Sequence, residues 1–412
     1  MLDVVILLSG GAIIWTLGWL IKNAPERRYN GPYDWERAAE RCGLRVRGAT
    51  YPRLTARAGP IEVTIEAFGE PSQDTRIVVK APVAPDFEKV KIYPQSVPSA
   101  RDVQIGDPGF DDALSIEGPA LQLFALLDSD TRRQMRTVNG AGRLEISPGQ
   151  IQAIQSKGAV SDVLPSLLEI VKRLGTPADI PRSLVENVKR DSESGARLQN
   201  LLALIREIPG DPGTGEALRA ACSDWSSPVR LQAARAMGAE GRDILLELAH
   251  RLEDDGISAE AVSFLGRELP AEQAKTLLDR AAVNGRPRTV RACLEVLGRG
   301  GAAGEALLIQ TLRHEEADIQ LAAARVLGRI GSAAAVLPLK EAAKHFGRDL
   351  GFGQATRQAI AEIQSRLQGA SPGQLSLAGA EAGQLSLAQD EAGQLSLATD
   401  PAGQLSLGDD DR

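Results

Sequence analysis

Aromatic residues, histidine and cysteine are scarce in this chain of 412 residues. Phenylalanine, tryptophan and tyrosine together make up 4% of it, and there are three histidines and three cysteines. The low aromatic content disfavours a β-sandwich with an aromatic core. His250, His314 and His345 follow no spacing that a histidine-ligated metal site uses. An odd number of scattered cysteines does not build a disulfide framework, so the cysteine content favours a reducing compartment.

Sequence motifs for catalysis are missing as well. The chain has no phosphate-binding loop ending in Gly-Lys-Ser/Thr, no Gly-x-Ser-x-Gly elbow and no Cys-x-x-Cys pair. The net charge is −7 and no block of basic residues stands out, so binding to nucleic acid through phosphate contacts is not expected. We therefore predict that the protein is not an enzyme, with no catalytic residue, no metal site and no cofactor.

One long apolar run is present at the amino terminus. Residues 4–21 carry no charge, and as a helix these 18 residues would span roughly 27 Å, close to the hydrocarbon thickness of a bilayer. Asp3 precedes the run, whereas Lys22 and Arg27 follow it, so the positive-inside rule predicts the amino terminus outside and the bulk in the cytoplasm. We expect residues 1–28 to be a single-pass anchor in a bacterial inner membrane. A cleaved signal peptide, a buried core helix and a periplasmic location are the alternatives.

Residues 29–180 are predicted to form a small α+β domain of unknown function. A short helix is expected over 34–42 and an amphipathic helix over 163–174. The stretch 61–67 alternates apolar and polar residues, as a half-buried strand does. Strands are expected at 44–47, 54–58, 61–67, 76–81 and 89–93, with a hairpin or strand at 143–146.

An acidic cluster interrupts this domain in the phrase Gly-Asp-Pro-Gly-Phe-Asp-Asp, which begins at Gly106. Its three carboxylates, Asp107, Asp111 and Asp112, fall within six residues and suit a hard cation such as Ca²⁺. However, the spacing does not match an EF-hand loop. We therefore favour a solvated turn in which the Asp side chains cap the backbone and Phe110 plugs the core. An enzyme or enzyme-maturation factor with its site in residues 29–180 stays open as the alternative function.

A helical repeat occupies residues 181–368. Four ten-residue stretches begin at Val229, Ile257, Thr289 and Ile319, and their closing glycines are 28, 32 and 30 residues apart. Each stretch carries a β-branched residue, then a small residue four positions on, then methionine or leucine, which is one face of a helix. Each closing glycine is expected in a left-handed cap. Cys293 holds a small position and is predicted to be a core residue. A period near 30 predicts an α-solenoid, so the fold class is mainly α.

Second helices are expected over 243–252, 271–281, 305–313 and 334–344. The helix pairs resemble HEAT repeats of the short bacterial type first noted in phycobilisome lyases, most closely in IQLAAARVLGRIGSAAAVLPLKEAAK. That resemblance implies a concave surface for protein partners, lined by the second helices. The exposed residues that it places there are Glu247, His250, Arg251, Gln273, Lys275, Asp279, Gln310, Arg313, Lys340 and Lys344.

The last segment, residues 369–412, has seven acidic side chains against one arginine and is expected to be disordered. It repeats GQLSL four times at a spacing of ten residues. The units resemble the sliding-clamp ligand Gln-Leu-Ser/Asp-Leu-Phe, but alanine or glycine replaces the aromatic anchor. Tandem ligands, β-strands that pair with each other or with a partner, and a simple spacer stay open. The residues concerned are Gln374, Leu375, Leu377, Gln384, Leu385, Leu387, Gln394, Leu395, Leu397, Gln404, Leu405 and Leu407.

Together these features predict a membrane-anchored scaffold or adaptor. It would bind protein partners through the solenoid, and the repeat tail is a second possible ligand-bearing segment.

Overall fold

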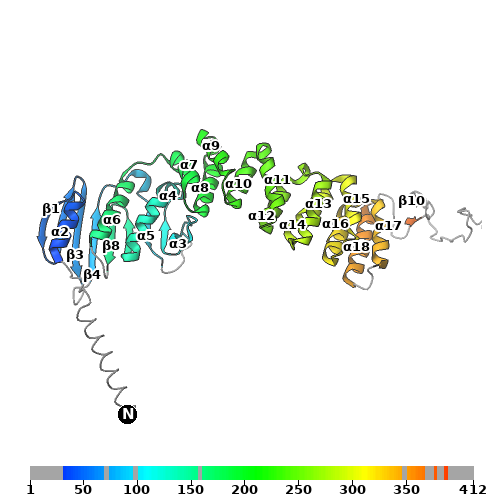
Figure 1. Ribbon diagram of the computed structural model, residues 1–412, viewed down its shortest axis with the longest axis horizontal. Coiled ribbons are helices and arrows are strands. Elements are labelled where there is room, and N and C mark those ends of the chain that lie inside the picture. The colour runs from blue at the N-terminus through cyan, green and yellow to red at the C-terminus, as the bar shows by residue number, and fades with distance from the viewer. Residues whose placement is uncertain are drawn as a thin grey trace, which may run out of the picture. The chain divides into compact units, whose positions relative to one another are not determined.

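The computed structural model describes residues 31–68, 74–95, 101–155, 160–345, 350–366, 375–377 and 385–387 (Figure 1). The chain forms two compact units, residues 1–241 and 242–412. The predicted membrane anchor lies outside the described residues. Among the described residues, no helix has both the length and the apolar composition needed to cross a membrane.

The first unit contains an eight-stranded antiparallel sheet in the order β1-β2-β3-β4-β8-β7-β5-β6. Four strands form a meander, and the β7–β8 hairpin adds β8 next to β4. A row of apolar residues crosses five strands at one level: Leu54, Ile65, Ile77, Ala153 and Leu144. All five are buried, so they mark the core face of the sheet. The strands are β1 (Arg45–Thr50), β2 (Arg53–Ala58), β3 (Ile61–Phe68), β4 (Asp74–Lys80), β5 (Lys91–Pro94), β6 (Leu114–Glu117), β7 (Gly142–Ser147) and β8 (Gln150–Gln155).

Helices pack on that face of the sheet and continue into the first part of the repeat. Helix α2 contacts β1, β2 and α6, while α6 also contacts β4 and α5. One hydrophobic core extends from Trp35 in α2 to Ala233 in α10, so the sheet and the first repeat helices share it. The helices of this unit are α2 (Gly31–Arg41), α3 (Pro108–Asp111), α4 (Ala120–Leu126), α5 (Ser129–Ala141), α6 (Val160–Gly175), α7 (Ile180–Arg190), α8 (Ser194–Glu207), α9 (Pro212–Ala221) and α10 (Ser227–Met237).

The second unit, green to orange in Figure 1, is a helical repeat. The small positions of the predicted stripe, Ala261, Cys293 and Ala323, are fully buried in α12, α14 and α16, which confirms that Cys293 is a core residue. Neighbouring pairs are also joined by polar contacts. Asp255 at the start of α12 accepts hydrogen bonds from the backbone N–H groups of Arg288 and Thr289, both at 2.9 Å, and so caps α14. The helices are α11 (Arg242–Arg251), α12 (Asp255–Leu265), α13 (Ala271–Val283), α14 (Pro287–Arg299), α15 (Gly301–Thr311), α16 (Ala317–Ile330), α17 (Val336–His345) and α18 (Leu350–Arg366).

The closing glycines of the repeat have two different roles. Gly238 and Gly266 have positive φ angles of 59° and 49° directly after their helices, which favours glycine, but their ψ angles of −121° and −119° are not those of the expected left-handed cap. The expectation is also wrong for Gly298 and Gly328, which lie inside α14 and α16. A Cβ atom on Gly298 would lie 2.9 Å from a Val326 methyl carbon, and one on Gly328 would lie 2.9 Å from the Cα of Ala359. These two glycines therefore permit close helix packing rather than helix termination.

Two of the four repeat units of the tail are partly described. Strand β9 (Leu375–Leu377) pairs antiparallel with β10 (Leu385–Leu387), and Leu385 lies opposite Leu377. Of the alternatives expected from the sequence, the first two units therefore show the one in which the GQLSL strands pair with each other. The other eight tail residues singled out from the sequence lie outside the described residues: Gln374, Gln384, Gln394, Leu395, Leu397, Gln404, Leu405 and Leu407.

Candidate functional site

The acidic cluster of the sheet domain is a buried turn. Asp107 caps α3 by accepting from the Phe110 N–H at 3.2 Å, and Phe110 is fully buried. Asp111 accepts from the N–H groups of Ile105 and Gly106 at 3.0 and 2.8 Å. Burial raises the pKa of Asp111 above its usual value, although these two donors oppose the shift. Capping by the carboxylates and the Phe110 plug are thus confirmed. Solvation is wrong for Asp107 and Asp111, because neighbouring parts of the fold cover both side chains.

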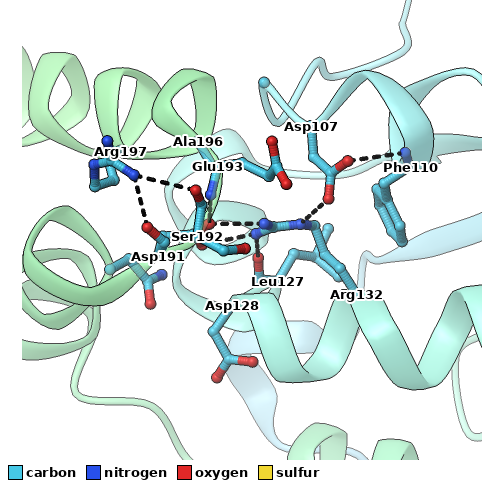
Figure 2. Close-up of polar contacts among 12 residues, drawn as sticks. Asp107, Phe110, Leu127, Asp128, Arg132, Asp191, Ser192, Glu193, Ala196 and Arg197 are labelled. Atoms are coloured by element: carbon cyan, nitrogen blue, oxygen red, sulfur yellow. Dashed lines mark hydrogen bonds and ion pairs between the residues drawn. The ribbon is translucent and has the colours of Figure 1, made fainter. Parts of the chain in front are cut away.

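Arg132 of α5 lies between Asp107 and Asp191, as Figure 2 shows. Its Nε donates to Asp107 at 2.8 Å, and its two Nη atoms donate to the two carboxylate oxygens of Asp191, both at 2.8 Å. Nη1 also donates to the Leu127 carbonyl at 2.8 Å. Burial alone would lower the pKa of the Arg132 guanidinium, but the hydrogen bonds and charges of Asp191 and Asp107 raise it overall. The arginine is therefore charged, and four of its five N–H groups donate to these partners.

A second buried arginine extends this cluster toward α9 and α10. Arg197 donates to the Asp191 backbone carbonyl at 2.8 Å and makes two bonds to Asp224, at 2.6 and 2.8 Å. The backbones of the turn and of α8 also pack closely at Gly106 and Gly195. There is no room for a side chain between them, because a Cβ atom added to Gly106 would lie 2.4 Å from the carbonyl carbon of Gly195. The cluster thus fastens the sheet to the first repeat helices. Within the described ranges, no group of three or more His, Cys, Asp or Glu residues could hold a metal ion.

Four of the ten residues predicted on the second helices form ion pairs within their own helices. Glu247 pairs with Arg251 at 3.4 Å, and Lys275 pairs with Asp279 at 2.7 Å, each one helical turn apart. His250 lies 3.1 Å from an Arg280 nitrogen, and burial, followed by the Arg280 charge, lowers the His250 pKa. The other five predicted residues are exposed: Gln273, Gln310, Arg313, Lys340 and Lys344. None of the ten lines the groove described next, and their role in binding a partner stays a prediction.

A groove of about 880 Å³ opens on the first helices of the pairs, α14 and α16, and on α18. Its floor is apolar and includes Leu294 and Val326. Alanines line it on two helices, Ala322 on α16 and both Ala355 and Ala359 on α18, and their short side chains leave room between the helices.

Charged side chains line the walls of the groove. Arg286, Arg291, Arg325 and Arg329 contribute positive charge, and four acidic residues balance it: Glu295, Glu316, Asp318 and Glu362. Arg329 pairs with Glu295. Arg291 and Arg325 are exposed and have no ion pair with another described residue, and the buried Nε of Arg286 has no hydrogen-bond partner there either. The groove therefore offers guanidinium donors that the described part of the chain leaves available.

The groove residues were missed from the sequence, although one signal was available. In the aligned repeat stretches the seventh position is charged in α14 and α16, where it is Glu295 and Arg325. Both residues line the groove. Charged residues at this aligned position of the first helices, considered together with the apolar stripe, would have indicated a polar rim on that side of the repeat.

Comparisons with known proteins give no family. No protein-family model matches the chain, and no curated protein matches it. The structure of human deoxyhypusine hydroxylase in complex with glycerol is similar over 45% of this chain and 85% of that chain, at 15% identity and a TM-score of 0.22. The crystal structure of an engineered protein is similar over 45% of this chain and 90% of that chain, at 18% identity and a TM-score of 0.26. The description of a helical repeat rests on the helix pairs themselves.

Proposed function

We propose that this protein is a non-enzymatic adaptor whose groove on α14, α16 and α18 binds a segment of a protein partner. Its helical repeat would be of the HEAT type. Residues 1–28 would hold it at the bacterial inner membrane, with the described units in the cytoplasm. The observation that supports this proposal is the groove itself, in which an apolar floor lies beside arginines that have no ion pair in the described chain.

The chemistry of the groove favours an extended peptide with aliphatic and acidic side chains. Its volume of about 880 Å³ lies at the upper end of the range for ligand sites. Leu321 and Ala322, which are only half-buried, offer apolar contacts. Arg291 and Arg325 suit carboxylates or backbone carbonyls, because a guanidinium presents several donors in a fixed plane. Since helices carry all four residues, little ordering is needed when a ligand binds.

The sheet domain gives less support for a catalytic role. The carboxylates of Asp107 and Asp111 already accept backbone N–H groups, and Asp107 also binds Arg132. These contacts favour a structural role for the acidic turn.

Peptide selection on the full chain tests the proposed groove. The chain would be purified in a mild non-ionic detergent, and displayed random peptides that bind it would be measured by fluorescence anisotropy. The double substitution Arg291→Glu with Arg325→Glu should weaken the selected peptides at least tenfold, because it reverses two charges on the groove wall. Arg313→Glu, just after α15, with Lys344→Glu on α17 changes the net charge equally away from the residues that line the groove and should alter affinity less than twofold. Equal effects of the two variants would show that the groove is not the site.

A further inference from the structure

The tail leaves the folded repeat beside the groove. Helix α18, which lines the groove, ends at Arg366. The Arg366 guanidinium donates to the carbonyl oxygens of Gly328 and Gly331 at 2.6 and 2.8 Å. These carbonyls belong to the carboxyl end of α16, where a positive charge is favourable. They flank Arg329 in the sequence, and Arg329 itself lines the groove. The carboxyl end of α18, which the tail follows in the sequence, thus lies at one end of the groove.

The tail also carries the chemistry that the groove suits. Each unit holds two leucines separated by one serine, so in an extended chain both leucines point to the same side. The segments that flank the third and fourth units contain Asp390, Glu391 and Asp400, and a run of three aspartates follows the fourth. Aliphatic side chains would meet the apolar floor, and the carboxylates would meet Arg291 and Arg325. The first two units already pair with each other as β9 and β10, which leaves the third and fourth.

We propose that residues 389–412 bind in the α14/α16/α18 groove of their own chain and compete there with the partner segment. The leucines of one GQLSL unit lie on the groove floor, and the neighbouring carboxylates lie at Arg291 and Arg325. The tail is then a ligand of its own chain, and a partner must displace it. This inference rests on the proposed function of the same groove.

The tether between α18 and the third unit is long enough for this contact. Because Leu375 of β9 lies opposite Leu387 of β10, the linker consists of the nine residues from Arg366 to Leu375 and the six from Leu387 to Gly393, and a flexible linker of that length has a root-mean-square span of roughly 20 Å. Helix α16 has 14 residues and is about 21 Å long, so the unit can reach the whole groove. Such a tether gives an effective concentration on the order of 1 mM. If the free unit binds with a dissociation constant of about 0.1 mM, the attached tail weakens a competing peptide about tenfold.

A labelled peptide of residues 389–412 is the probe, and the protein is the full chain in mild detergent. One variant keeps the tail but replaces its last four unit leucines: Leu395→Asp, Leu397→Asp, Leu405→Asp and Leu407→Asp. The peptide should bind this variant about tenfold more tightly than it binds the unaltered chain. Adding Arg291→Glu and Arg325→Glu should abolish binding, whereas adding Arg313→Glu and Lys344→Glu should not change it.

Three results would overturn the inference: no binding of the peptide to the tail variant, equal binding to the variant and the unaltered chain, or equal loss with both charge-reversal pairs. Sedimentation velocity could give a fourth such result. If the unaltered chain self-associates and the tail variant does not, the tail binds the groove of a second copy rather than that of its own chain. Peptides selected from the random library separate the two proposals. If they bind the groove while residues 389–412 do not, the adaptor function stands and the self-ligand falls. If neither binds, both fall.

Discussion

Replacing Arg132 with methionine should destabilise the first unit by about 3–5 kcal/mol, because it leaves the buried Asp191 without its cation and Asp107 with only Arg136, at 3.5 Å. The side chains of Asp107 and Asp191 are only 2% and 0% exposed, so water cannot replace the lost donors. The Leu127 carbonyl also loses a hydrogen bond, which adds to the cost. Methionine fills much of the arginine volume, so the effect arises mainly from charge. A loss of this size is a large part of the 5–15 kcal/mol that stabilises a typical domain.

Urea unfolding of the full chain, followed by circular dichroism, would measure the change in the free energy of unfolding. Hydrogen exchange would locate it, since protection of the α5 and α7 amides should fall by roughly two to nearly four powers of ten. Arg133→Met on the same helix is the matched control. Arg133 pairs with Asp130 at 2.7 Å, but it is 64% exposed, so its loss should cost under about 1 kcal/mol.

A third variant separates charge from packing. Combining Arg132→Met with Asp107→Asn and Asp191→Asn removes the uncompensated charges and should restore at least half of the lost stability. A single variant that costs less than about 1 kcal/mol would refute the view that this cluster fastens the unit. A triple variant no more stable than the single one would assign the effect to packing.

Four further predictions concern single residues. Asp255→Ala should lower the free energy of unfolding of the second unit by about 1–2 kcal/mol, measured by urea titration. Burial alone would raise the Asp255 pKa, but hydrogen bonds from two N–H groups of α14 lower it overall. The loss of stability should therefore be present at neutral pH and should shrink as the pH falls through that lowered pKa. Gly106→Ala should cost roughly 2–5 kcal/mol in Tm or urea measurements, because Gly106 has a φ of 92° and no space for a Cβ atom. Gly353→Ala should stabilise the chain by about 0.5–1 kcal/mol, because no atom lies within 4 Å of the added Cβ. If Gly353→Ala were less stable than Gly106→Ala, the structural accounts of both glycines would be contradicted. Burial raises the pKa of the Cys293 thiol to about 12, so a disulfide reagent at pH 8 should modify it only after unfolding; rapid reaction of the native protein would show that it is accessible.

The sequence predicted most of the sheet domain where local patterns are strong. The alternation at 61–67 corresponds to β3, and the amphipathic stretch 163–174 corresponds to α6. Two strands were missed for different reasons. Strand β6, Leu-Ser-Ile-Glu, is short, and three of its four residues are buried, so it shows no alternation. Strand β8, Gln-Ile-Gln-Ala-Ile-Gln, does alternate and follows a turn that contains Pro-Gly, so its signal was present.

The candidate sites were harder to predict because their residues meet only through the tertiary fold. Arg132 is 25 residues from Asp107 and 59 from Asp191, and no local spacing connects them. The groove combines residues of α13, α14, α16 and α18, from Ala282 to Glu362. A periodic pattern shows which face of each helix is apolar, but it does not show which neighbouring faces remain apart.

The core that joins the sheet to the first repeat helices has a consequence for how this architecture can be divided. A stack of helix pairs has two ends, and its terminal helices must hide faces that inner pairs bury against each other. At the amino-terminal end, α7 packs on α4, and Asn187 donates to the Phe124 carbonyl at 2.9 Å. Leu184 and Leu204 are fully buried in the same core. The sheet domain is therefore the end cap of the stack, and a fragment that begins at the first repeat helix would expose its own interior.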